Sequence, residues 1–149
     1  MVVFLLTLPV AYNRESATQI MGLRTFPLVS VSTCGFLLIT QSVLGQDAVD
    51  AQSRVMQGIL AGIGFIGGGA ILKGEDKVLG SATAASIWLT GALGIAVAYG
   101  RYDIAIFLSL FNILVLRWLT PIKEIIRDNN VENDDVAIMG DPVEDSPKP

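Results

Sequence analysis

The stretch "GILAGIGFIGGGAILK" covers residues 58–73 and decides how the rest of the chain is interpreted. Within it, "GIGFIG" (62–67) has the G-x-G-x-x-G spacing of a dinucleotide-binding loop. Such a loop follows a strand, opens a helix and precedes, by about 20 residues, an acidic residue that binds the ribose. Here the motif lies inside an uncharged run, residues 55–72, and the nearest acidic residues, Glu75 and Asp76, come too early. We therefore reject a dinucleotide site and expect no cofactor.

Long uncharged runs on both sides of this stretch predict membrane helices. Residues 25–46, 55–72 and 78–100 contain no charged side chain and are 22, 18 and 23 residues long. The hydrocarbon core of a bilayer needs about 20 helical residues. Two shorter uncharged runs cover residues 1–13 and 104–116. Charged residues make up 16% of the chain, against about 25% in soluble domains. We predict an all-α membrane protein with a bundle of about five transmembrane helices, in preference to a soluble helical protein.

The predicted transmembrane domain covers residues 1–121. Its spans are expected at about residues 1–13, 27–45, 55–73, 80–99 and 103–120. The first is short, because 13 residues reach only about 20 Å as a helix, and Pro9 interrupts it. Either its helix continues through Arg14 and Glu15, or the chain lacks a few residues upstream. Residues 122–149 are expected to form a cytoplasmic interfacial helix and an acidic disordered tail.

The basic residues of the connecting segments predict the orientation in the membrane. Lys and Arg are enriched in cytoplasmic loops. With the N-terminus outside and the C-terminus in the cytoplasm, eight basic residues fall inside and two outside. The inside set is Arg14, Arg24, Lys73, Lys77, Arg117, Lys123, Arg127 and Lys148, and the outside set is Arg54 and Arg101.

Glycine supplies six of the twelve residues from 58 to 69. In lipid, helix association depends on close approach of the backbones, which small residues four positions apart permit. Gly58 with Gly62, and Gly80 with Ala84, have this spacing. We therefore expect the third and fourth segments to form the packed centre of the bundle. The candidates for helix packing or partner contact are Gly58, Gly62, Gly64, Gly67, Gly68, Gly69, Gly80, Thr83 and Trp88.

Three consecutive glycines, at 67–69, also predict a break or bend, because glycine lowers helix stability. Bare backbone carbonyls inside a membrane must be satisfied by protein or by water. The glycine-rich segment could thus serve tight packing alone or line a polar cavity, and the sequence leaves both open.

Polar residues within the spans, among them Ser86, Thr90 and Asn112, are expected to form interhelical hydrogen bonds. The arginines at the helix ends either anchor the bundle at the interface, or one turns inward to pair with Glu15 or to bind an anion or lipid phosphate. These polar and charged candidates are Asn13, Arg14, Glu15, Arg24 and Arg54.

The remaining composition argues against several classes of function. The chain has no histidine and one cysteine, Cys34, and no paired carboxylates suit catalysis, so we expect no enzyme. The acidic residues avoid the predicted spans, so no intramembrane metal site is expected. The net charge is +1 over residues 1–121 and −5 over residues 122–149. No basic patch indicates nucleic acid, and the expected partners are the lipid bilayer and another membrane protein or a second copy of the chain.

Three ordered motifs resemble the MgtC/SapB family of bacterial inner-membrane proteins. They are "NRESATQIMGLRTFPLV" (13–29), "RVMQGILAGIGFIGGGAILKG" (54–74) and "VLGSATAASIW" (78–88). The resemblance covers about residues 8–120. The chain departs from the family pattern at Asn13, where the family usually has glutamate, and at Ala11, where it has glycine. The positions that match are Arg14, Gly22, Leu23, Arg24, Thr25, Arg54, Gly62, Gly64, Phe65, Gly67, Gly69, Gly80, Thr83, Ala84, Ala85 and Trp88.

The resemblance implies a multi-pass protein of the bacterial inner membrane, of the shorter SapB-like form without a folded C-terminal cytoplasmic domain. It also implies a role in adaptation to low magnesium or other stress, in a family associated with virulence. Family members are thought to act by binding other membrane proteins, including the F-type ATP synthase. The leading hypothesis is therefore a non-enzymatic modulator of a membrane partner. The alternative is a transporter or channel component for Mg²⁺ or another small solute.

Overall fold

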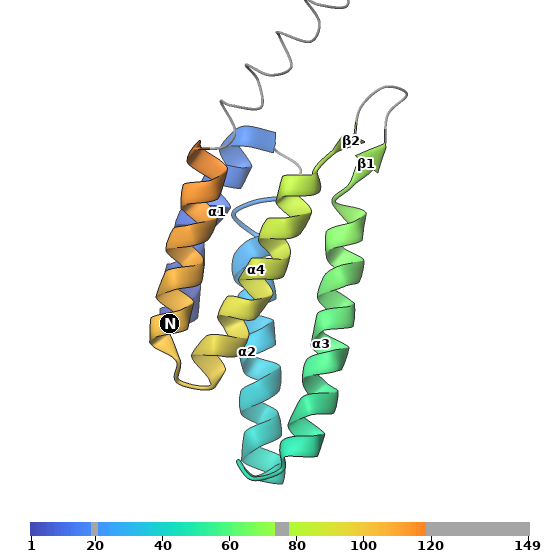
Figure 1. Ribbon diagram of the computed structural model, residues 1–149, viewed down its shortest axis with the longest axis vertical. Helices are drawn as coiled ribbons and strands as arrows, with labels where there is room; N and C mark the ends of the chain where they lie inside the picture. The colour runs from blue at the N-terminus through green and yellow to red at the C-terminus, as the bar shows by residue number, and fades with distance from the viewer. Residues whose placement is uncertain (19–20, 74–77, 119–149) are drawn as a thin grey trace, which may run out of the picture. The chain divides into compact units, whose positions relative to one another are not determined.

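The computed structural model describes residues 1–18, 21–73 and 78–118, which are almost entirely helical (Figure 1). The helices are α1 (Val2–Thr18), α2 (Thr25–Leu44), α3 (Val49–Gly69), α4 (Ser81–Ala98) and a fifth helix at 102–118. A short hairpin of β1 (Leu72–Lys73) and β2 (Val78–Leu79) joins α3 to α4. The predicted all-α bundle of five helices is confirmed. The expected tail, residues 122–149, lies outside the described residues.

Helix α1 continues through Arg14 and Glu15 to Thr18, as the first of the two alternatives for this segment required. Pro9 lies inside the helix and does not end it, contrary to the expectation that it interrupts the span. The 17 residues of α1 give a length of about 26 Å. Within the described part of the chain, α2 and α4 are the helices long and apolar enough to cross a membrane by length and composition.

The compact unit formed by Met1–Leu116 has α2 and α4 at its centre. These two helices make the most extensive contact in the unit, while α1 and α3 pack on them from opposite sides (Figure 1). The expectation that the third and fourth segments form the packed centre therefore holds for α4 and is wrong for α3, which is peripheral.

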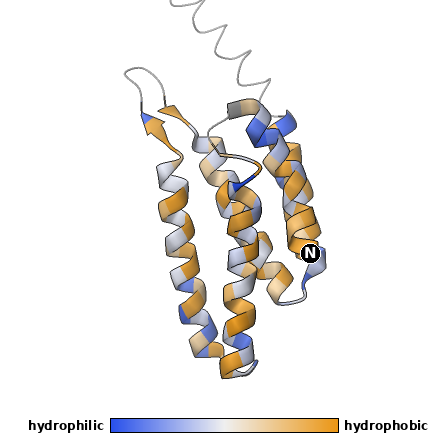
Figure 2. Ribbon diagram, turned by 180° about the vertical axis from the view of Figure 1, so that it is seen from behind, coloured by the Kyte–Doolittle hydropathy of each residue, from blue (hydrophilic) through white to orange (hydrophobic). Residues whose placement is uncertain are grey.

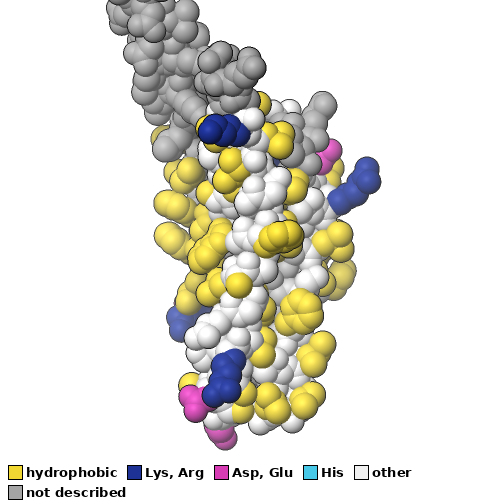
Figure 3. Space-filling view, turned by 90° about the vertical axis from the view of Figure 1, so that its right-hand side faces the viewer, with side chains coloured by type: hydrophobic (Ala, Val, Ile, Leu, Met, Phe, Trp, Pro, Cys, Tyr) yellow, Lys and Arg dark blue, Asp and Glu magenta, His cyan; other side chains and the backbone are white. Residues whose placement is uncertain are grey.

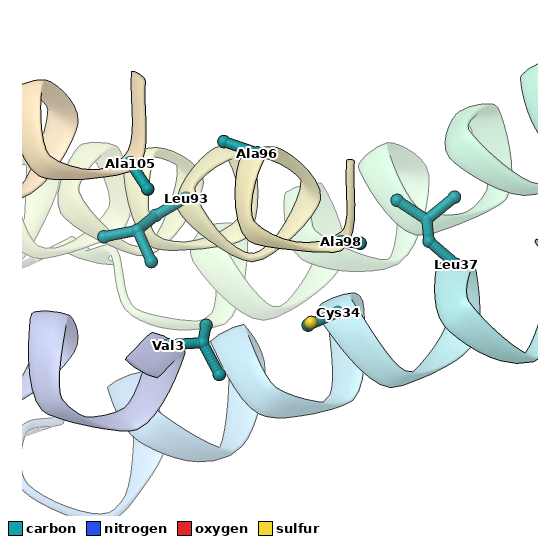
Figure 4. Packing of buried hydrophobic residues seen from close by; sticks show 7 residues of the cluster. All are labelled: Val3, Cys34, Leu37, Leu93, Ala96, Ala98 and Ala105. Atoms are coloured by element: carbon teal, nitrogen blue, oxygen red, sulfur yellow. The ribbon is translucent and has the colours of Figure 1, made fainter. Parts of the chain in front are cut away.

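Two clusters of buried side chains fill the unit. The first is drawn in Figure 4 and combines residues from α1, α2, α4 and the fifth helix; it consists of Val3, Cys34, Leu37, Leu93, Ala96, Ala98 and Ala105. The second consists of Val10, Ala11, Phe26, Ile63, Ala70, Ile87 and Leu116. Outside these clusters, large apolar side chains are exposed along the helices, which suits a surface covered by lipid. Figure 2 shows that hydrophobic residues are distributed along all the helices.

The three-glycine run marks the end of α3. The N–H groups of Ala70 and Ile71 donate to the carbonyls of Gly67 and Gly68 at 3.0 and 3.1 Å, which tightens the last turn before β1. The chain returns through β2, where Leu79 pairs with Leu72. The predicted break is thus a helix end, and the hairpin that follows it was not expected.

Gly80 begins α4 in a left-handed conformation, with φ at 86°. A Cβ at this position would collide with the carbonyl oxygen of Ala70. Glycine is therefore required for both the turn and the close approach, and Gly80 lies between the end of α3 and the start of α4.

Candidate functional site

An open groove of about 540 Å³ lies between α2 and α3. No charged side chain lines it, and most of the lining is apolar. The lining residues are Leu28, Val29, Ser32, Thr33 and Phe36 from α2, and Gly58, Ile59, Gly62, Ile63 and Ile66 from α3. This groove is therefore not the polar cavity that was one of the two alternatives for the glycine-rich segment.

The α3 side of the groove has bare backbone at Gly58 and Gly62. A Cβ added to either glycine would meet nothing within 4 Å. Both residues are exposed and belong to the four-residue spacing that lets helices approach closely. Neither glycine is packed against another helix of the chain. Of the two roles expected for them, helix packing or contact with a partner, contact with a partner stays a prediction. Figure 3 shows the side of the unit on which α3 lies, where a column without hydrophobic side chains runs between hydrophobic ones.

The other glycine candidates of α3 divide in the same way. Gly67 packs against Ala84 of α4, whose carbonyl oxygen lies 3.5 Å from the position of a Cβ, so it is a packing residue. A Cβ added at Gly64 would lie 4.0 Å from Nε1 of Trp88, and Trp88 is 48% exposed. Gly68 and Gly69 meet nothing within 4 Å. Among these four glycines of α3, Gly67 is therefore the one in close contact with another helix of the unit.

The glycines that allow the closest helix contacts are on α4, and the sequence analysis did not name them. A Cβ at Gly94 would strike the backbone of Ser30 and lie 3.0 Å from Thr33 on α2. A Cβ at Gly91 would strike the side chain of Ile63 on α3. These two residues explain why α4 is central. No local signal in the sequence distinguishes Gly91 and Gly94 from Gly58 and Gly62, because whether a glycine is packed depends on which helix faces it.

Buried polar side chains lie inside the unit, and most of them donate to backbone carbonyls, while Ser86 pairs with another buried side chain. The Ser86 hydroxyl donates to Asn112 Oδ1 at 2.9 Å, which joins α4 to the fifth helix. Ser109 of the fifth helix donates to the carbonyl of Leu6 in α1 at 2.6 Å. The expectation of interhelical hydrogen bonds is confirmed for Ser86 and Asn112, whereas Thr90 donates to the Ser86 carbonyl within its own helix.

Thr83 is fully buried near the start of α4. Its hydroxyl has no hydrogen-bond partner among the described residues. Burying a hydroxyl without a hydrogen bond lowers the stability of the fold by about 1–3 kcal/mol. Within the described residues, Thr83 thus contributes packing volume and no polar contact.

Arg14 turns into the bundle and is 5% exposed, so interfacial anchoring is wrong for this arginine. Its Nη2 donates to Asn13 Oδ1 at 2.9 Å. Pairing with Glu15, one of the alternatives for an inward arginine, is not observed; Glu15 Oε2 accepts the backbone N–H of Leu23 at 3.0 Å. Gly22 is needed there, since a Cβ would collide with Glu15. The motif before α2 thus fastens its first turn to the end of α1.

Arg24 and Arg54 are exposed, as interfacial anchors would be. An exposed ion pair of Arg101 and Asp103, 2.8 Å long, lies where the fifth helix begins. Within the described residues, no group of three or more His, Cys, Asp or Glu residues could hold a metal ion.

Gln52 forms a clasp at the end of the unit where α2 is joined to α3. Its side chain is 5% exposed, and its Nε2 donates to the carbonyls of Gly45 and Gln46 at 3.2 and 2.9 Å. The hydroxyl of Tyr99, at the end of α4, donates to Gln52 Oε1 at 2.8 Å. All polar atoms of this amide are used for structure, and the sequence analysis missed it because its partners come from distant segments.

These features define a helical membrane-type protein with an uncharged groove between α2 and α3. The MgtC family model matches residues 1–125, so the chain belongs to the MgtC family. SrpB of Synechococcus elongatus is 32% identical over 127 residues, which is 78% of this chain and 70% of SrpB.

Other relatives are longer than this chain. YhiD of Escherichia coli, named as a candidate magnesium transporter, is 33% identical over 72% of this chain and 52% of its own length. MgtC of Brucella abortus is 32% identical over 83% of this chain and 50% of its own length. SapB of Bacillus subtilis is 29% identical over 90% of this chain and 60% of its own length. The chain thus spans about half the length of YhiD and MgtC. No solved structure matches.

Proposed function

We propose that this MgtC family protein is a non-enzymatic modulator of other membrane proteins in the bacterial inner membrane, linked to growth at low Mg²⁺ or under stress. Its partner contributes an uncharged transmembrane helix, which binds in the groove between α2 and α3. In this proposal the protein crosses the membrane several times, with its N-terminus outside and its C-terminus in the cytoplasm.

The groove is the observation that supports this proposal. Its ten lining residues carry no charge, and Gly58 and Gly62 expose backbone to whatever fills it. A lipid chain packs poorly against such a surface. A helix with small residues can bring its backbone close to these glycines and gain van der Waals contact. The polar side chains of the interior, by contrast, are largely used in hydrogen bonds to carbonyls of their own helix or in contacts between helices.

Partner capture from membranes solubilised in mild detergent tests this function. Gly62→Leu places a bulky side chain in the groove, and recovery of the partner should fall by about tenfold or more, which corresponds to about 1.4 kcal/mol. Gly35→Leu is the matched control, since Gly35 also meets nothing within 4 Å and does not line the groove. Equal recovery with wild type and Gly62→Leu would contradict the proposal.

Magnesium transport is the second candidate, supported by the name of YhiD. The described acidic residues, Glu15, Asp47, Asp50 and Asp103, are all exposed, whereas Mg²⁺ sites commonly use one or two carboxylates. Uptake of Mg²⁺ into proteoliposomes separates the candidates. A modulator purified alone should show no uptake above empty vesicles, and saturable uptake would favour the transporter.

A further inference from the structure

One row of exposed residues runs along α3 beside the groove. Asp50, Arg54, Gly58, Gly62 and Ile66 are spaced four apart, so they form a single ridge of the helix. All five are exposed. The ridge is bare backbone at its centre and charged at the end near α2, where Arg54 lies about 6 Å and Asp50 about 12 Å along the axis from Gly58.

The two charges on this ridge have no partner within the described chain. Neither Asp50 nor Arg54 makes an ion pair with another described residue, whereas Arg101 and Asp103 do. Figure 3 shows acidic and basic side chains close together at the lower end of the face on which α3 lies.

A second copy of this chain complements the ridge. Two copies in one membrane have the same orientation, so a twofold axis between them is parallel to the membrane normal and their α3 helices run parallel. Identical residues then face each other across the axis. Glycine facing glycine allows close approach, while a lone charge would face its own copy and repel it. Because Asp50 and Arg54 are one turn apart with opposite sign, each can pair with the other residue of the second copy.

We propose that the groove between α2 and α3 is occupied by α3 of a second copy, in a parallel twofold pair that crosses at Gly58 and Gly62. Asp50 of each copy pairs with Arg54 of the other. The pair does not depend on the proposed function. The two uses of the groove exclude each other, so in this proposal a partner helix binds after the two copies separate.

Charge exchange on the full-length protein tests the pair without any partner. Two differently tagged copies are expressed together, one tag is captured in mild detergent, and the co-captured fraction of the other is measured. Wild type should be co-captured. Asp50→Arg paired with itself, and Arg54→Glu paired with itself, should each fall by about tenfold, because like charges then meet across the axis.

The mixed pair, Asp50→Arg with Arg54→Glu, should restore co-capture. In this pair one copy carries two basic residues at the end of the ridge and the other carries two acidic ones. Attraction within either chain is therefore absent, and only attraction between the chains explains the rescue. The substitutions are on an exposed surface, and size-exclusion profiles verify that each variant is folded.

A second measurement probes the crossing point. Gly58→Leu should abolish co-capture, and Gly35→Leu should retain it. Absence of co-capture for wild type, or a mixed pair as weak as the single variants, overturns the pairing. Because no partner is present, that result leaves the capture of a partner by the groove as a separate question, decided by Gly62→Leu.

Discussion

At the scale of single residues, the same amino acid has opposite roles on two neighbouring helices. Gly94 and Gly91 of α4 allow backbone contact inside the unit, whereas Gly58 and Gly62 of α3 leave backbone open to the surroundings. Glycine permits close approach but does not choose the neighbour. Which helix faces a given glycine depends on how the helices are arranged in space, and here α4 packs against both α2 and α3.

Gly94→Ala tests this assignment. The new methyl group would strike the backbone of Ser30 on α2, which cannot move aside as a flexible side chain would. We expect a loss of about 1–3 kcal/mol in the free energy of unfolding, measured as a lower midpoint of thermal unfolding in a fixed detergent. Gly35→Ala, where nothing lies within 4 Å, should leave the midpoint unchanged or raise it. An unchanged midpoint for Gly94→Ala would show that α2 and α4 are not in backbone contact.

The sequence could predict a bundle of membrane helices, because that class of fold depends on the composition of segments of about 20 residues, the length of a membrane helix. It could not predict which glycines pack, because this depends on contacts between segments such as Gly94 and Ser30. Likewise, Leu28 and Phe36 complete the groove from α2, and nothing local in α2 indicates that α3 lies beside them. The inward position of Arg14 was one of two alternatives, and only the packing of α1 decides it.

At the scale of helices and strands, hydrogen bonds hold the fifth helix to its neighbours. Ser86 and Asn112 connect it to α4, and Ser109 connects it to the backbone of α1. The fifth helix also exposes large apolar residues, among them Phe107 and Phe111, whose rings stack at 5.8 Å. Polar contacts therefore specify its place, while its outer face remains suited to lipid.

A double-mutant cycle of Ser86→Ala and Asn112→Leu should measure this connection. Hydrogen bonds between membrane helices couple by about 0.6 kcal/mol on average and up to about 1.7, so the two changes together should cost less than their sum. Thr83→Val is the matched control, because the Thr83 hydroxyl has no partner among the described residues, and its replacement should be neutral or stabilising. Unfolding in a fixed detergent gives the free energies, and additive changes for Ser86 and Asn112 would rule out the coupling.

At the scale of the whole molecule, the number of membrane crossings and the orientation are linked. An odd number of spans places the two ends of the chain on opposite sides. Five helices together with the eight-to-two distribution of basic residues predict an external N-terminus and a cytoplasmic C-terminus.

A reporter fused after Asp128 decides this arrangement. A reporter that folds only in the cytoplasm should be active there, and alkaline phosphatase, which requires the periplasm, should be inactive. Fusion in the connection between α2 and α3, at Gln46, should give the reverse pattern. The opposite result at Asp128 would show that one of the five helices does not cross the membrane.

The two ends of α3 are fastened, although its middle is open. At one end Gln52 ties the connection of α2 and α3 to Tyr99, and at the other end Gly80 lies against Ala70. A helix held at both ends can bend away from α2 only if these contacts break. The distance between α2 and α3 is therefore fixed before another helix binds. The fixed width of the groove then selects which helix can bind. A helix with bulky side chains at its crossing point is too wide to enter, whatever its overall hydrophobicity.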